Sequence, residues 1–107
     1  MKSRFEFLQE LVSRDKNDSF SRYGLALELV KQNEKDKAIV HFLELIKRDS
    51  DYVPAYYQLA KTYELLENYS EAFSVYEKGM SVAKKKNDFH ALSELQEAKD
   101  ELTEGIS

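Results

Sequence analysis

Side chains of matching size recur 34 residues apart along most of this chain, and this period restricts the fold more than any other feature. Leu25 and Ala26 are followed, one period later, by Leu59 and Ala60. A fixed period of this size indicates an array of repeated helical units. The other matched positions are Leu29 with Tyr63, Ala38 with Ala72, Phe42 with Tyr76, and Ile46 with Met80.

Each period has room for two helices. The first helices of the two pairs are predicted at 19–32 and 53–67, and the second helices at 35–48 and 70–85. Only short polar segments separate the two helices of a pair, so these helices are expected to run antiparallel. With three glycines and one proline in 107 residues, the chain has few tight turns and favours long helices.

The spacing around Ala60 indicates a close helix crossing. Tyr56, Leu59, Ala60 and Tyr63 lie three or four residues apart and therefore share one helix face. A small residue between bulky ones allows a second helix to approach closely, and Ala72 is the small residue expected on that helix. A larger side chain at position 60 is expected to overpack the crossing.

The two ends of the chain are predicted to add one helix each. Ser3 and Glu6 form a capping box, and the same 34-residue step makes this N-terminal helix the second half of a truncated repeat. At the other end, Asp88 is a predicted N-cap and Gly105 a predicted stop. The apolar faces expected to pack are Phe5, Leu8, Leu11 and Val12 in the N-terminal helix, and Phe89, Leu92, Leu95, Ala98 and Leu102 in the C-terminal helix.

This pattern resembles the tetratricopeptide repeat family. The second repeat carries the family signature at Tyr56, Leu59, Ala60, Tyr63, Ala72, Tyr76 and Gly79. The first repeat departs from it, with Arg22 in place of an aromatic residue and Leu45 in place of a small one. The resemblance implies an all-α fold in which antiparallel helix pairs stack in a right-handed superhelix. Residues 1–107 would form a single domain: an N-terminal half-repeat helix (3–16), repeat 1 (19–52), repeat 2 (53–86) and a C-terminal capping helix (87–104).

Several functional classes are disfavoured by the sequence. Cysteine is absent, and His41 and His90 do not occur in a metal-ligand spacing, so we expect no enzyme, no cofactor and no metal. A net charge of −4 disfavours nucleic acid. Glu6 and Glu10 interrupt the only candidate signal peptide, and no run of about 18 apolar residues exists. We therefore expect a cytoplasmic chain without membrane contact.

The resemblance implies a protein–protein interaction module. In the family, the first helix of each pair lines the inner, concave surface, and side chains that avoid the packing positions form its groove. Among the side chains at these groove positions in this chain, only Lys61 is basic. A short apolar or amphipathic segment is therefore a better ligand than an acidic tail. The predicted groove residues are Phe20, Tyr23, Leu27 and Val30, then Pro54, Tyr57, Lys61 and Glu64, with His90, Glu94 and Glu97 of the capping helix facing the same way.

Two alternatives remain open at this point. Two full repeats are fewer than the three or so that a stable array usually needs, so the same groove could be buried against a second copy in a homodimeric scaffold. Alternatively, the N-terminal helix could cover Phe20 and Tyr23, which would make them core residues. The identity of a partner does not follow from the sequence.

Overall fold

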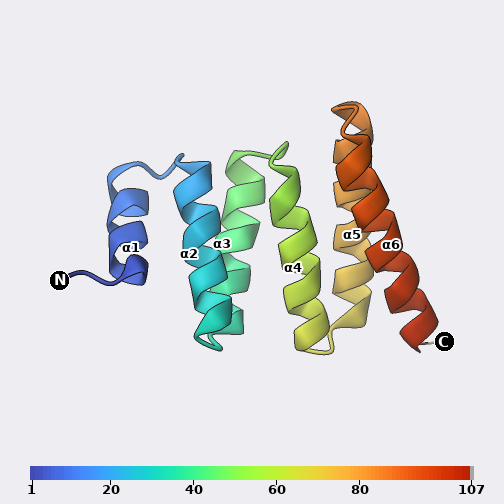
Figure 1. Ribbon diagram of the computed structural model, residues 1–107, viewed down its shortest axis with the longest axis horizontal. Helices are drawn as coiled ribbons and strands as arrows, with labels where there is room; N and C mark the ends of the chain where they lie inside the picture. The colour runs from blue at the N-terminus through green and yellow to red at the C-terminus, as the bar shows by residue number, and fades with distance from the viewer. Residues whose placement is uncertain (107) are drawn as a thin grey trace. The chain divides into compact units, whose positions relative to one another are not determined.

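The computed structural model describes residues 1–106, and these residues form six α-helices and no strand (Figure 1). The all-α prediction is therefore confirmed. None of these helices combines the length and the apolar composition that crossing a bilayer requires. The helices are α1 (Arg4–Arg14), α2 (Ser19–Lys31), α3 (Lys35–Arg48), α4 (Val53–Leu65), α5 (Tyr69–Lys85) and α6 (Phe89–Ile106).

Side-chain caps fix the start of three helices. The Ser3 hydroxyl accepts a hydrogen bond from the Glu6 N–H at 3.1 Å, which confirms the predicted cap of α1. The carboxylate of Asp88 likewise accepts from the Ala91 N–H at 3.1 Å at the start of α6. Asp18 does the same for α2, through the Ser21 N–H at 3.0 Å. Each cap satisfies a backbone donor that the first helical turn leaves without a partner.

Three of the helix-to-helix turns share one backbone conformation. Asn33, Glu67 and Asn87 adopt left-handed conformations with φ of 62°, 59° and 57°. In each case the next residue donates a backbone hydrogen bond across the turn, for example from the Glu34 N–H to the Leu29 carbonyl at 2.8 Å. This geometry closes a helix C-terminus and reverses the chain at once.

The fold divides into two compact units. The N-terminal unit, Met1–Tyr52, contains α1, α2 and α3, and α2 packs against both of the others. A Cβ atom added at Gly24 would lie 3.3 Å from a methyl carbon of Leu8, so glycine allows α1 to approach α2 closely. The buried apolar residues of this unit are Leu8, Val12, Leu25, Ala26, Leu29, Ala38, Phe42 and Leu45.

The C-terminal unit begins at Val53 and contains α4, α5 and α6. Helix α5 packs against both α4 and α6, and α4 also contacts α6. Ala60 and Ala72 are completely buried. Helices α4 and α5 approach closely at Gly79 of α5, where an added Cβ would lie only 2.7 Å from the Cβ of Tyr56 in α4. Small residues in this unit therefore let its helices pack closely.

One predicted core residue of α6 is exposed. Leu95, Ala98 and Leu102 are buried as predicted, but Phe89 is 65% exposed and Leu92 is only half-buried. The prediction for Phe89 was wrong because the spacing of apolar residues continues to the first residue of α6, whereas the buried stripe begins one to two turns later.

Candidate functional site

Helix α2 presents an apolar face that its unit leaves partly open. Phe20 is 74% exposed, whereas Tyr23, Leu27 and Val30 are half-buried. The Tyr23 ring lies against Phe42, with centroids 6.3 Å apart, and against Tyr52, at 5.4 Å. Phe20 is therefore not covered by α1, whereas Tyr23 contributes one side of its ring to the core.

The predicted residues of α4 form a connected polar and aromatic set. Tyr57 packs edge-on against Tyr76, with ring centroids 6.4 Å apart. The ammonium of Lys61 lies 5.6 Å from the centroid of the Tyr57 ring and 3.9 Å from a carboxylate oxygen of Glu64. Pro54, in the first turn of the same helix, is exposed.

Glu64 has a structural partner that its sequence position did not reveal. The hydroxyl of the fully buried Tyr76 donates a hydrogen bond to the Glu64 carboxylate. Burial first, and then this carboxylate, raise the pKa of Tyr76 above its usual range, so the phenol remains a protonated donor. Glu64 thus satisfies a buried polar group in addition to lying on the predicted binding face.

A small polar cleft lies between α4 and α6. Its volume is ≈ 150 Å³, and it is lined by Tyr57 and by three glutamates of α6, together with Ala98. The glutamates follow steps of three and four residues, so they share one helix face. Glu94 pairs with His90, whose Nε2 lies 2.8 Å from a carboxylate oxygen. The lining glutamates are Glu94, Glu97 and Glu101.

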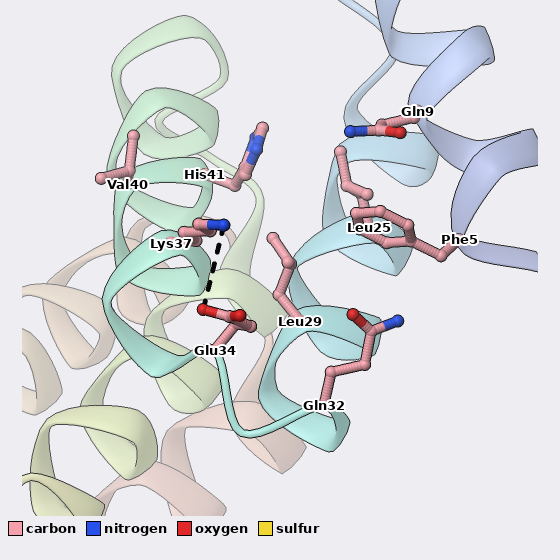
Figure 2. A pocket seen from close by; sticks show the side chains of 9 residues that line it. All are labelled: Phe5, Gln9, Leu25, Leu29, Gln32, Glu34, Lys37, Val40 and His41. Atoms are coloured by element: carbon pink, nitrogen blue, oxygen red, sulfur yellow. Dashed lines mark ion pairs between the residues drawn. The ribbon is translucent and has the colours of Figure 1, made fainter.

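A larger cleft lies within the N-terminal unit (Figure 2). Its volume is ≈ 320 Å³. Leu25 and Leu29 of α2 lie between the side chains of α1 and those of α3, and the pair Glu34–Lys37, 4.0 Å apart, lies beside Leu29. The sequence did not predict this cleft, because its lining combines residues from three helices. The lining residues are Phe5, Gln9, Leu25, Leu29, Gln32, Glu34, Lys37, Val40 and His41.

A buried arginine lies next to His41 in the same unit. Arg22 is only 7% exposed, and one of its terminal nitrogens lies 3.3 Å from Nδ1 of His41. The other terminal nitrogen donates to the Lys16 carbonyl at 3.3 Å, while Nε is buried without a hydrogen-bond partner. Burial, and then the charge of Arg22, lower the pKa of His41 below its usual value, which favours a neutral imidazole.

Within residues 1–106, no group of three or more His, Cys, Asp or Glu side chains is placed to hold a metal ion.

Comparison with known proteins places this helical-repeat architecture in a family. A sequence profile of the tetratricopeptide repeat matches residues 53–86. The solution NMR structure of a tetratricopeptide repeat domain protein from Salinibacter ruber is 41% identical to this chain and superposes with a TM-score of 0.81, covering 87% of this chain and 93% of that one. The chain belongs to the tetratricopeptide repeat family.

More distant solved structures share the fold alone. The TPR2B domain of yeast Sti1, in a complex with pHsp70, is 18% identical with a TM-score of 0.88, covering 94% of this chain and 81% of that one. PcrH, in complex with the chaperone binding region of PopD, is 13% identical with a TM-score of 0.88, covering 96% and 78%. A comparison with curated proteins gave no significant match. Proteins of this family generally mediate protein–protein interactions.

Proposed function

We propose that the chain binds a short apolar or amphipathic segment of a partner protein, through the α2 face of its N-terminal unit and the α4 face of its C-terminal unit. The observation that carries this proposal is the exposure of Phe20, an aromatic residue 74% open to solvent on a face shared with Tyr23, Leu27 and Val30. Clustered apolar residues at a surface usually mark a site of interaction.

The α2 face supplies the apolar part of the interaction. Fully burying a phenylalanine side chain contributes roughly 1.5–3 kcal/mol relative to leaving it exposed. The half-buried Leu27 and Val30 extend this surface along the helix. Tyr23 is held against Phe42 and Tyr52, so its ring is already ordered and loses little further freedom on binding.

The α4 face supplies polar groups beside an aromatic ring. Tyr57, Lys61 and Glu64 offer a ring, an ammonium and a carboxylate within a few ångströms of one another. This chemistry suits a segment with one apolar and one polar side. It suits an acidic tail less well, because Lys61 is the only base among the predicted groove residues of α2 and α4, and Glu64 already pairs with it.

The comparisons support the kind of ligand and do not identify it. The Sti1 domain is in a complex with pHsp70, and PcrH with a region of PopD. Both are structurally similar to this chain at low sequence identity, so their ligands are precedents for binding a piece of another protein. The proposal includes no catalytic step, no cofactor and a cytoplasmic location, in keeping with a chain that has no cysteine.

A second copy of this chain is the alternative occupant of the same faces. The exposed Phe20 would then be buried in a symmetric dimer, in which each copy contributes the same patch. Molar mass measured by light scattering across a concentration range separates the two. A constant monomer mass favours a different protein as partner, and a rise to twice the monomer mass favours the dimer.

The binding proposal is tested by selecting peptides from a random display library against the wild-type protein. The affinity of the selected peptides is then measured for Phe20→Ser and for Leu43→Ser, a matched control because Leu43 is also an exposed apolar residue but lies on α3. We expect amphipathic peptides whose affinity falls about tenfold or more with Phe20→Ser, as for an aromatic anchor. Equal losses in both variants, or a loss only with Leu43→Ser, would contradict the proposal.

A further inference from the structure

The α4–α6 cleft has a chemistry that the proposed function does not yet use. It holds ≈ 150 Å³ between the Tyr57 ring and the face of α6 that carries Glu94, Glu97 and Glu101. A cavity needs roughly 10–15 Å³ of volume measured with a water-sized probe to hold one water, so the cleft has room for several. The cleft is therefore on the scale of one side-chain head group.

The Tyr57 ring already carries a cation. The ammonium of Lys61 lies 5.6 Å from its centroid, within the range at which the negative face of a ring attracts a positive charge. The ring is also held in place edge-on by Tyr76. This contact shows that the Tyr57 ring lies where it attracts a cation.

The carboxylates around this ring are not matched by cations of the chain. In the described part of the chain, Glu97 and Glu101 form no ion pair, and Glu94 is paired only with His90. By contrast, Glu44 on α3 pairs with Arg48 at 2.9 Å. Like charges three and four residues apart on a helix repel each other, so the face is destabilising until a cation approaches it.

We propose that the α4–α6 cleft binds the head group of a lysine or arginine side chain in the partner segment. This inference rests on the proposed function and specifies the polar side of the segment. The cation would lie against the Tyr57 ring and within reach of the carboxylates of Glu97 and Glu101. Charge complementarity favours a basic side chain, because the cleft is lined by carboxylates and an electron-rich ring and by no cationic side chain.

The test uses the full-length chain and three synthetic twelve-residue amphipathic peptides with blocked ends. They are identical except at one central position, which carries lysine, norleucine or glutamate. Affinities are measured by NMR titration up to about 1 mM peptide, because weak binding of this order is still detectable. We expect the lysine peptide to bind about 3- to 10-fold more tightly than the norleucine peptide, and the glutamate peptide to bind least.

Matched variants assign the preference to the cleft. The double variant Glu97→Gln/Glu101→Gln should bring the lysine peptide down to the affinity of the norleucine peptide. The control is Glu6→Gln/Glu71→Gln, which makes the same change in charge at exposed positions on α1 and α5 and should retain the preference. Tyr57→Leu should weaken binding of the lysine peptide more than that of the norleucine peptide.

The outcomes distinguish the inference from the function on which it rests. If the lysine and norleucine peptides bind equally, or if the glutamine variant keeps the lysine preference, the inference is overturned and the proposed function stands. If none of the three peptides binds, both are overturned. A lysine preference that disappears in Glu97→Gln/Glu101→Gln and is retained in Glu6→Gln/Glu71→Gln supports both.

Discussion

At two pairs of equivalent positions, 34 residues apart, the N-terminal unit has apolar side chains and the C-terminal unit has polar ones. In the N-terminal unit, Phe42 is completely buried and the residue equivalent to Glu64 is Val30. In the C-terminal unit, the equivalent of Phe42 is Tyr76, which is just as deeply buried and donates to Glu64. A phenol can replace a phenyl ring here because a carboxylate replaces a valine. In each unit the buried ring and the side chain at the second position match chemically. Exchanging only one residue of a pair would leave a buried hydroxyl without an acceptor or a carboxylate without its donor.

A second pair of positions shows the same dependence in packing. Tyr56 and Gly79 approach so closely that a Cβ on the glycine would lie 2.7 Å from the tyrosine Cβ. The equivalent positions of the N-terminal unit hold Arg22 and Leu45. There a buried guanidinium replaces the aromatic ring, and its Nε has no hydrogen-bond partner. The residue type at a repeat position therefore depends on the side chains packed around it more than on the position itself.

The largest expected effect is that of removing the Tyr56 ring. Tyr56 is 4% exposed, so Tyr56→Ala leaves a large cavity in the C-terminal unit, and the free energy of unfolding should fall by about 3–5 kcal/mol. Arg22→Ala at the equivalent position should cost less, because it also removes a poorly satisfied buried charge. Urea unfolding followed by circular dichroism measures both. Equal losses would mean that the two positions are filled equally well.

The close approach at Gly79 predicts the next effect. Gly79→Ala should lower the free energy of unfolding by about 1–3 kcal/mol, because the new methyl group meets the Tyr56 Cβ, which cannot rotate away. Gly105→Ala is the matched control, since its Cβ would meet nothing within 4 Å. That control should be neutral or stabilising by up to about 1 kcal/mol, as alanine favours a helix. A tolerated Gly79→Ala would show that α4 and α5 are farther apart than described.

The Tyr76–Glu64 hydrogen bond predicts a smaller effect. Tyr76→Phe should cost about 1 kcal/mol of unfolding free energy, a typical net value for one intramolecular hydrogen bond. The reverse change, Phe42→Tyr, should cost at least as much, because Val30 offers no side-chain acceptor. Thermal unfolding of the two variants checks this. A neutral Phe42→Tyr together with a costly Tyr76→Phe would indicate another acceptor in the N-terminal unit.

The smallest effect concerns pH and the Arg22–His41 contact. Because burial and Arg22 lower the pKa of His41, the unfolded chain takes up the proton first as pH falls below about 6.5. The stabilising contribution of the neutral imidazole is therefore complete above that pH and is lost below it. Wild-type protein should lose unfolding free energy between about pH 7 and pH 5 faster than His41→Gln. Parallel curves for the two proteins would show that His41 does not contribute.

The sequence predicted the features that repeat, but it did not predict individual contacts made by residues outside the repeat pattern. The helix pairs and the buried alanines followed from spacing, the stacked fold also from the family resemblance, and the caps at Ser3 and Asp88 from residue type. The contact between Arg22 and His41 did not, because the two residues share no helix and no motif. Phe89 was wrong because spacing alone cannot show where a buried stripe begins.

The candidate site was predictable to a similar extent. Spacing placed Phe20, Tyr23, Leu27 and Val30 on one face, and the structure gives their degrees of exposure. Spacing also placed Glu94 and Glu97 of α6 on the same side as Tyr57, but it could show neither that Glu64 is the acceptor of a buried tyrosine nor that Glu101 joins them in a cleft. Both depend on side chains from neighbouring helices.

The most direct test of the binding account is an NMR chemical-shift map of the full-length chain with a display-selected peptide. The account predicts that the perturbed residues lie on the faces of α2 and α4, centred on Phe20, Leu27 and Tyr57. Perturbations centred instead on the exposed apolar residues of α3, Val40 and Leu43, with the α2 and α4 faces unchanged, would contradict it.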